Sequence, residues 1–218
     1  MTEERPVLSP EFEDQRPVLR AGLTGIGLAL EPARQQQLLG YLELMRRWNR
    51  AYNLTAIVDP GEMVARHLLD SLVLLPHLPT GRLLDAGTGA GLPGVPLAIA
   101  CPERQMVLLD GNGKKIRFLG QVRRELGLDN IEPVQGRLET FRPEPAPDAI
   151  VARALAPLER LVRWTACWLD RGIPLLAMKG DLSESERLAV PAPYNVSLMD
   201  LDVPGLSARR CLVRVEKP

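Results

Sequence analysis

A glycine-rich turn at residues 85–94 constrains the fold of this chain more than any other feature. It reads Asp-Ala-Gly-Thr-Gly-Ala-Gly-Leu-Pro-Gly, follows an apolar run at 82–86 and precedes a helical pattern that reaches about Cys101. Glycine tolerates positive φ and lets the backbone approach a ligand closely, and the first amides of the following helix have no intrahelical partner. The sequence therefore predicts a strand–turn–helix unit that binds a nucleotide-like ligand.

Two kinds of ligand compete for this turn. The dinucleotide pattern G-x-G-x-x-G is met from Gly89 onward, and Asp110 follows at a suitable distance for a ribose hydroxyl. Asp85, however, would place a carboxylate beside a pyrophosphate, which is electrostatically unfavourable, whereas the ammonium and sulfonium of S-adenosylmethionine would attract it. The pattern favours a methyl-donor site at Asp85, Gly87, Gly89 and Gly91, with Asp110 accepting from the ribose. A dinucleotide site and a plain Gly-rich connector are the alternatives.

Short apolar runs alternate with helical patterns after residue 79. Strands are predicted at 82–86, 105–110, 131–135, 148–152, 174–179, 194–201 and 210–216. Helices are predicted from the glycine turn to about 101, at 114–126 and at 158–169. Because alternating strands and helices form a parallel sheet with helices on both faces, we expect an α/β core over 80–218.

The residues before this core are expected to form two parts. Residues 1–20 hold three prolines among charges and are predicted to be a loose leader. Residues 21–79 are predicted to be an N-terminal helical extension. Apolar residues at helical spacing predict one helix at about 32–52 and a second at about 61–75. Between them, residues 53–57 are predicted to be non-helical. Leader, extension and core are expected to form one compact unit overall.

Composition excludes several classes of protein. The chain has 27 basic and 27 acidic residues and a formal net charge of zero, which excludes a strongly basic coat for nucleic acid. No apolar run approaches the roughly 18 residues of a membrane span. The three cysteines lie far apart and give neither a metal knuckle nor a disulfide framework. We therefore expect a cytoplasmic monomer without a metal or a membrane anchor.

Several stretches of this sequence carry a family resemblance. They are 48–55 (Trp-Asn-Arg-Ala-Tyr-Asn-Leu-Thr), 67–71 (His-Leu-Leu-Asp-Ser), 85–97, 108–110, 114–119, 151–154 and 178–180. With them the chain resembles the bacterial RsmG (GidB) family of 16S rRNA guanine-N7 methyltransferases, over nearly everything after about residue 22. The resemblance implies a Rossmann-like class I methyltransferase sheet with an N-terminal helical extension. It also implies S-adenosylmethionine as cofactor and methyl transfer to N7 of guanine 527 in the 16S rRNA of the small ribosomal subunit.

The resemblance also assigns roles to single positions. Gly87 and Leu92 would contact the donor, and Leu138 with Glu139 would bracket its adenine. Arg153 would lie at the donor and substrate pocket. The sequence departs from the family at Ala90, where proline is more common, and at Gly111, where serine is common. The second departure removes a possible side-chain hydrogen bond near the ribose.

The proposed reaction makes few demands on side chains. Guanine N7 has a lone pair and no proton, so it attacks a sulfonium methyl without a general base, and catalysis rests on alignment. No catalytic residue is assigned, and Arg153 and Asn53 are the positioning candidates. Arg153 is interpreted as a clamp on the donor carboxylate or on an RNA phosphate, with an ion pair to Asp148 or Glu159 as the alternative. Asn53 either reaches the pocket mouth or turns the chain.

Basic residues supply candidates for RNA binding. The helix after Asp110 carries Lys114, Lys115 and Arg117. The first helix of the extension carries Arg46, Arg47 and Arg50, and Arg210 lies near the C-terminus. They either track rRNA phosphates or form ordinary solvated faces. His67 lies on an apolar helix face and is predicted to be a buried, hydrogen-bonded histidine.

Two other functions stay open at this point. One is methylation of another substrate, such as a protein or small molecule. The other is a non-catalytic factor for ribosome assembly or RNA binding. Because the net charge is zero, free RNA should bind weakly, and we expect an assembling small subunit to be the substrate.

Overall fold

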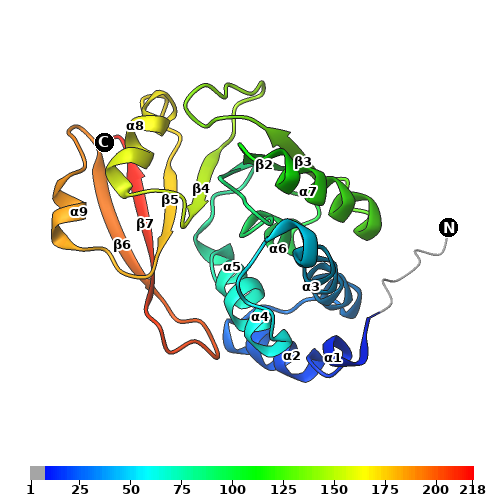
Figure 1. The fold of residues 1–218 in the computed structure, drawn as a ribbon. Helices are drawn as coiled ribbons and strands as arrows, with labels where there is room; N and C mark the ends of the chain where they lie inside the picture. The colour runs from blue at the N-terminus through cyan, green and yellow to red at the C-terminus, as the bar shows by residue number, and fades with distance from the viewer. Residues whose placement is uncertain (1–7) are drawn as a thin grey trace.

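A seven-stranded sheet organises the protein, whose computed structural model describes residues 8–218 (Figure 1). Its strands are β1 (Leu83–Ala86), β2 (Met106–Asp110), β3 (Ile131–Gln135), β4 (Ala149–Arg153), β5 (Leu175–Lys179), β6 (Asn195–Leu201) and β7 (Arg210–Glu216). They lie in the order β3-β2-β1-β4-β5-β7-β6. The α/β fold predicted from the sequence is confirmed, and every strand begins and ends within one residue of its predicted bounds.

The expectation of a parallel sheet is wrong for the last two strands. The five strands β1 to β5 pair in parallel, whereas β7 is antiparallel to both β5 and β6. The reason lies in the connection, because the loop 202–209 holds no helix to carry the chain back across the sheet. A short connection between neighbouring strands allows antiparallel pairing only.

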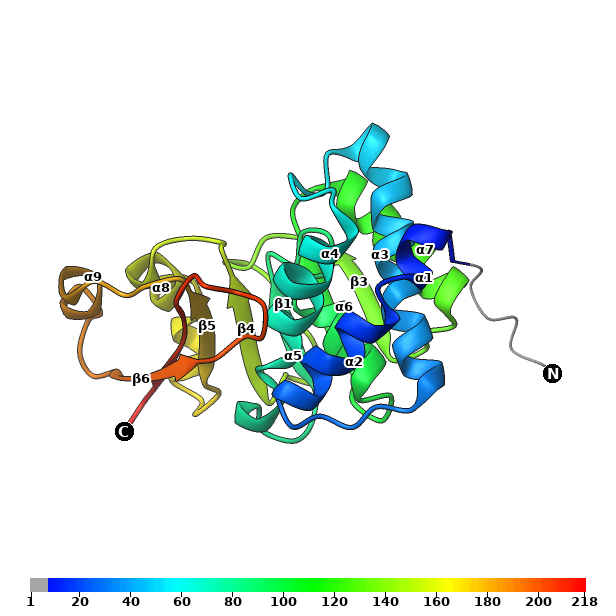
Figure 2. The ribbon, with the colours of Figure 1, turned by 90° about the horizontal axis from the view of Figure 1, so that it is seen from below.

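Helices cover both faces of the sheet. They are α1 (Pro10–Glu13), α2 (Arg16–Gly25), α3 (Pro32–Tyr52), α4 (Pro60–Met63), α5 (Asp70–Leu72), α6 (Gly94–Ala100), α7 (Gly113–Leu126), α8 (Leu158–Leu169) and α9 (Glu184–Leu188). Figure 2 shows α1 to α5 gathered on the same side as α6, away from α8 and α9. Alternate strand residues feed two cores: Leu83 packs with α1 to α7, and Leu84 packs with α8. All four residues of β1 are buried, as expected of a parallel strand covered on both faces.

The predicted helix at 61–75 is broken into shorter pieces. Pro60 begins α4, and the Asp59 carboxylate accepts from the amide of Glu62 at 2.9 Å. A π-helical turn then spans Val64–Leu69, followed by α5 and a 3₁₀ turn at Leu75–His77. Such π-helical turns occur frequently at functional sites.

The leader predicted at 1–20 is wrong for the part that the structure describes, while residues 1–7 lie outside it. Residues 10–13 and 16–25 are helical, and Phe12 and Leu19 are completely buried. Proline and charge suggested disorder, but Pro10 and Pro17 occupy first-turn helix positions, where proline is favoured. The Arg46 guanidinium lies 4.9 Å from the Phe12 ring centroid and pairs with Glu11. This segment is therefore part of the folded unit.

The helical extension and the core also meet at the glycine turn. The Tyr41 hydroxyl, buried on α3, donates to the carbonyl of Ala90 at 2.7 Å. Side chains of α3 share one hydrophobic core with residues of β1, α6 and α7. A boundary near residue 80 thus separates two stretches of sequence that pack as one body.

Replacing Phe12 with alanine tests the packing of α1. We expect Phe12→Ala to lower the free energy of unfolding by about 3–5 kcal/mol, because it empties a fully buried site. Val18→Ala is the matched control, since Val18 on α2 is 46% exposed and its loss should cost less than about 1 kcal/mol. Urea unfolding of both variants measures the difference. Equal small effects would mean that α1 is not packed in solution.

Candidate functional site

The carboxyl ends of β1 and β4 meet where the order of the sheet reverses. From β1 the chain builds outward to β2 and β3, and it then returns to β4 on the other side of β1. Ligands of open α/β sheets bind outside the strand ends at such a point. Both the glycine turn after β1 and Arg153 at the end of β4 lie here.

The glycine turn has a backbone that other residues would not adopt. Gly87, Gly89 and Gly91 have φ angles of 68°, 61° and 99°. A Cβ at Gly91 would lie 2.5 Å from Val95 Cγ2 and 2.7 Å from a Leu119 methyl, so only glycine fits. At Gly89 the nearest atom to such a Cβ is the Lys115 ammonium at 3.7 Å, so this part of the turn is open to a ligand.

Asp85 holds the turn from inside. Its Oδ2 accepts from the Thr88 hydroxyl at 2.6 Å and from the amide of Gly94 at 2.8 Å, and the residue is completely buried. Burial raises the pKa of Asp85 to about 6, against the lowering effect of these two hydrogen bonds. Its Oδ1 is buried and has no hydrogen-bond partner within residues 8–218. Through Oδ2 the Asp85 side chain thus fixes both ends of the turn, and Oδ1 accepts no hydrogen bond from the described residues.

Asp110 joins the end of β2 to the same turn. Its Oδ2 accepts from the amide of Gly89 at 2.9 Å, and its Oδ1 accepts from the amide of Asn112 at 2.8 Å. The structure therefore brings Asp110 to the open part of the turn. Leu138 is buried in the second core, and Glu139 beside it is exposed.

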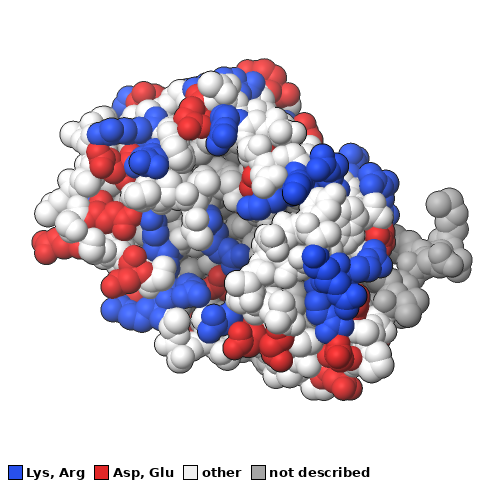
Figure 3. All heavy atoms as spheres, viewed as in Figure 1, with Lys and Arg blue, Asp and Glu red and all other residues white. Residues whose placement is uncertain are grey.

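A cavity of about 400 Å³ lies beside the turn, at the ends of β4 and β5. It is lined by Ile57, Arg66, His67, Asp70, Arg153, Ala154, Met178, Lys179, Gly180 and Arg210. Figure 3 shows this face hollowed between its two halves, with Lys and Arg side chains along the hollow. No residue of the glycine turn lines the cavity, so the two features are neighbours and not one pocket. We call it the basic cavity.

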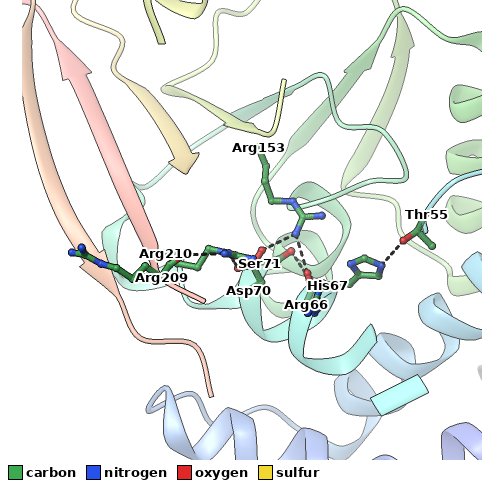
Figure 4. Close-up of polar contacts among 8 residues, drawn as sticks. All are labelled: Thr55, Arg66, His67, Asp70, Ser71, Arg153, Arg209 and Arg210. Carbon is green, nitrogen blue, oxygen red and sulfur yellow. Dashed lines mark hydrogen bonds and ion pairs between the residues drawn. The ribbon is translucent and has the colours of Figure 1, made fainter. Parts of the chain in front are cut away.

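A buried carboxylate organises the basic cavity (Figure 4). Asp70, whose side chain is 3% exposed, accepts from Arg153 Nη1 through Oδ2 and from Arg210 Nε through Oδ1, each at 2.8 Å. Arg153 Nη1 also donates to the carbonyl of Arg66 at 3.1 Å. The ion pair considered for Arg153, with Asp148 or Glu159, is wrong: its partner comes from the extension. One carboxylate thus ties α5, β4 and β7 together.

His67 forms part of the cavity wall as a neutral side chain. Its Nε2 lies 3.0 Å from the Thr55 hydroxyl, whose oxygen also accepts from the amide of Ile57 at 3.0 Å. Burial, and then the positive charge of Arg153, lower the pKa of His67 to about 4. The prediction of a buried, hydrogen-bonded histidine is confirmed, and the imidazole is uncharged at neutral pH.

Asn53 does not reach the basic cavity. It ends α3 in the left-handed conformation, with φ of 49°, and is exposed. The alternative role, turning the chain, fits this position. Asn49 fixes the segment after α3, because its Oδ1 accepts from the amides of Leu54 and Thr55 at 2.6 and 3.0 Å. Sequence reasoning missed Asn49 as well as Asp70, although Asp70 interrupts an otherwise apolar run.

The predicted RNA-binding residues separate into three groups. Arg46 pairs with Glu11, and Arg47 pairs with Glu125 at 2.7 Å, so both hold elements of the fold together. Four others make no ion pair with any residue that the structure describes: Arg50, Lys114, Lys115 and Arg117. Arg210 lines the basic cavity. The structure does not bring all seven residues to one place.

Comparison with known proteins identifies the family. A family model described as rRNA small subunit methyltransferase G matches residues 34–213. The chain belongs to this family. A relative named ribosomal RNA small subunit methyltransferase G from Marinobacter nauticus is 48% identical over 91% of this chain and 94% of its own length. One of the same name from Pseudomonas aeruginosa is 49% identical over 89% and 92%.

Solved structures agree on the fold at low sequence identity. A putative O-methyltransferase from Klebsiella pneumoniae aligns with a TM-score of 0.56 and 18% identity, over 94% of this chain and 98% of its own. A SAM-dependent methyltransferase from Aquifex aeolicus aligns with a TM-score of 0.50 and 17% identity, over 72% and 93%. Membership of the family makes the protein a methyltransferase, and these structures support its Rossmann-like sheet, which carries an N-terminal helical extension.

The described residues show neither a metal cluster nor a membrane helix. Among residues 8–218 no three His, Cys, Asp or Glu side chains are grouped so that they could hold a metal ion. In the same range no helix combines the length and the apolar character that a membrane crossing requires.

Asp70→Asn tests the carboxylate that joins the two arginines. We expect a loss of about 1–3 kcal/mol in the free energy of unfolding, because two guanidiniums are left facing each other without an anion. The loss stays below that of a fully buried pair, since the Arg153 and Arg210 side chains are 19% and 23% exposed. Glu125→Gln, which breaks the exposed pair with Arg47, should cost under about 1 kcal/mol. Matching losses in urea unfolding would contradict a special role for Asp70.

Asp85 and His67 should act on stability in opposite directions as pH changes. The pKa of Asp85 rises on folding from 3.8 to about 6, so its contribution is full below pH 3.8 and is lost as pH rises through 6. The pKa of His67 falls from 6.5 to about 4, so its contribution is full above pH 6.5 and is lost as pH falls through 4. Each amounts to about 3 kcal/mol at most.

In the unmodified protein the effects of Asp85 and His67 on the pH dependence of the free energy of unfolding oppose each other. A variant that lacks one of the two groups reveals the effect of the other. Asp85→Asn should make stability rise more steeply between pH 4 and 6.5 than in the unmodified chain, and His67→Gln should make it fall. Urea unfolding at several pH values in this window measures both slopes. If both variants follow the pH dependence of the unmodified protein, neither group is perturbed as described.

Proposed function

We propose that this protein transfers the methyl group of S-adenosylmethionine to N7 of guanine 527 in 16S rRNA of the small ribosomal subunit. The observation that carries the proposal is the family match over residues 34–213. The arrangement of the site supports it, because an open glycine turn and a basic cavity adjoin at the reversal point of the sheet.

The residues of the glycine turn fit the methyl donor. Asp85 Oδ1 is a buried oxygen without a partner among residues 8–218, and an ammonium group would satisfy it. Each Asp110 oxygen accepts one protein hydrogen bond and keeps a lone pair for a ribose hydroxyl. The residues proposed to hold the donor are Asp85, Gly87, Gly89, Gly91, Leu92, Asp110, Leu138 and Glu139. When bound, the donor supplies an electrophilic methyl group on a sulfonium.

No side chain has to move a proton in this reaction. Guanine N7 carries a free lone pair, so the chain's contribution is to position the base in line with the methyl group. His67 is neutral and its Nε2 is engaged by Thr55. Arg153 is fixed by Asp70 and by the Arg66 carbonyl, which suits a residue that positions a partner.

An assembled particle is the expected substrate. The net charge of the whole chain is zero, and sequence-independent RNA affinity depends on the number of phosphates that a protein neutralises. The basic groups are instead gathered locally, around the basic cavity and on α7. Such a distribution needs a substrate whose shape presents the target nucleotide to the site.

Methyl transfer to small subunits that lack this modification tests the proposal directly. With labelled S-adenosylmethionine we expect label at N7 of one guanine of 16S rRNA, which mapping of the labelled nucleotide identifies. Label on another base or on a ribosomal protein would overturn the substrate assignment and leave the fold untouched. Comparable labelling of naked 16S rRNA would contradict the preference for a particle.

Asp110→Ala should separate donor binding from folding. We expect at least about a tenfold loss of S-adenosylmethionine affinity, because one charged hydrogen-bond acceptor for the ribose is removed. Asp129→Ala, at an exposed position after α7, removes the same charge and should leave the affinity unchanged. Calorimetric titration measures both. Unchanged binding by Asp110→Ala would place the donor away from the end of β2.

A further inference from the structure

The basic cavity carries an excess of positive charge at its wall. Arg66, Arg153, Lys179 and Arg210 line it, and Asp70 is the one carboxylate among its lining residues. Lys179 pairs with Glu186 at 2.7 Å, outside the lining. The three arginines therefore share one carboxylate, and a surplus of positive charge remains in the cavity.

Several donors of these cations are unused. Arg153 employs Nη1 for Asp70 and for the Arg66 carbonyl, which leaves Nε and Nη2 without a partner in residues 8–218. Arg210 employs Nε and Nη1, which leaves Nη2. The Arg66 guanidinium makes no ion pair with any described residue. Guanidinium donors fixed in this way suit the oxygens of a phosphate group.

The charge of the cavity argues against the target base as its occupant. Guanine becomes a cation when N7 is methylated, and the donor is a cation before transfer. A wall with surplus positive charge destabilises both. A phosphodiester is an anion and meets no such penalty.

We propose that the basic cavity binds a phosphodiester group of the RNA backbone next to the target guanine, and that the base reacts outside it, toward the glycine turn. The inference rests on the proposed function. It assigns Arg153 to the RNA backbone and not to the carboxylate of the donor. In this arrangement the cavity fixes the register of the nucleotide, as phosphate contacts do in other complexes with nucleic acids.

The floor of the cavity supports this assignment. Asp70 holds Arg153 and Arg210 by one oxygen each, so it orients the two guanidiniums without neutralising both. Ala154, directly after Arg153, has a left-handed backbone with φ of 51°, which costs energy in a residue other than glycine. Gly180 has no side chain, and a Cβ there would lie 3.8 Å from Arg210 Nη1. The backbone thus leaves room where an anion would approach.

The first experiment titrates the whole protein with inorganic phosphate and follows backbone amide resonances by NMR. We expect saturable shifts at Ala154 and Gly180, which line the cavity, and none at Gly89. Guanosine, which has the base but no phosphate, should not shift these two amides. S-adenosylmethionine should shift Gly89 and leave the response to phosphate intact.

Charge-removing variants locate the binding site. Arg66→Gln should weaken phosphate binding about tenfold, by loss of a charged hydrogen bond, and it leaves every buried ion pair in place. Arg210→Gln should weaken it at least as much, and Arg210→Lys should restore part of the affinity. Arg163→Gln is the matched control, because Arg163 is an exposed arginine on α8, on the other face of the sheet. Phosphate affinity should not change in that variant.

Three outcomes would overturn the proposal. Shifts at Ala154 and Gly180 with guanosine but not with phosphate would make the cavity a base pocket. Loss of the phosphate response when S-adenosylmethionine is bound would assign the anion site to the donor carboxylate. An unchanged response in both Arg66→Gln and Arg210→Gln would place the bound phosphate elsewhere.

A second experiment separates this proposal from the proposed function. The KM for small subunits is measured at several salt concentrations for the unmodified protein, Arg66→Gln and Arg163→Gln. Loss of one phosphate contact should lower the slope of log KM against log salt by about 0.7–0.9, in Arg66→Gln alone. An unchanged slope overturns the proposal even where methylation proceeds. If small subunits are not methylated at all, the proposed function fails, and the phosphate titration still decides the nature of the cavity.

Discussion

The placement of the Asp70 carboxylate is the constraint on which the site depends. A buried carboxylate is tolerated only with cationic partners and hydrogen bonds, and Asp70 finds them in Arg153 at the end of β4 and Arg210 at the start of β7. These residues are 83 and 140 positions away from it in the chain. Because one acid serves two bases, Asp70 fixes the extension against β4 and β7, two of the strands that border the basic cavity.

The glycine turn follows a similar logic with neutral partners. Asp85 holds the turn through Thr88 and Gly94, and Tyr41 from α3 fixes it from the opposite side through the Ala90 carbonyl. The extension is thus a structural element of the donor region as well as of the basic cavity. Without the extension, the glycine turn would lose its contact with Tyr41 and the basic cavity would lose Asp70. The extension and the core therefore depend on each other structurally.

Local patterns predicted most of the fold because they depend on neighbours in the chain. Apolar runs and helix spacing located all seven strands and the long helices α3, α7 and α8 to within a residue or two. The positions of the glycine turn and of Asp110 follow from the same apolar runs, because the turn comes directly after β1 and Asp110 ends β2. What failed depended on distant partners: the burial of Phe12, the break of the 61–75 helix by a π-helical turn, and the pairing of Arg153 with Asp70. No pattern around Arg153 indicates an acid from another part of the chain.

Charge alone does not show which basic side chains are free to meet a ligand. Arg46 and Arg47 are each paired with an acid that lies far away in the sequence. Their neighbour Arg50 on α3 makes no ion pair with any residue from 8 to 218. Whether a basic side chain is available to a ligand is decided by tertiary partners, which composition does not reveal.

The position of β7 has a consequence for biosynthesis. β7 inserts between β5 and β6, although it follows both of them along the chain. It also carries Arg210, the second base on Asp70. Because chains are made from the N-terminus and fold progressively, every other strand exists before the basic cavity can close. A nascent chain therefore lacks this part of the site until its last strand has emerged from the ribosome that makes it.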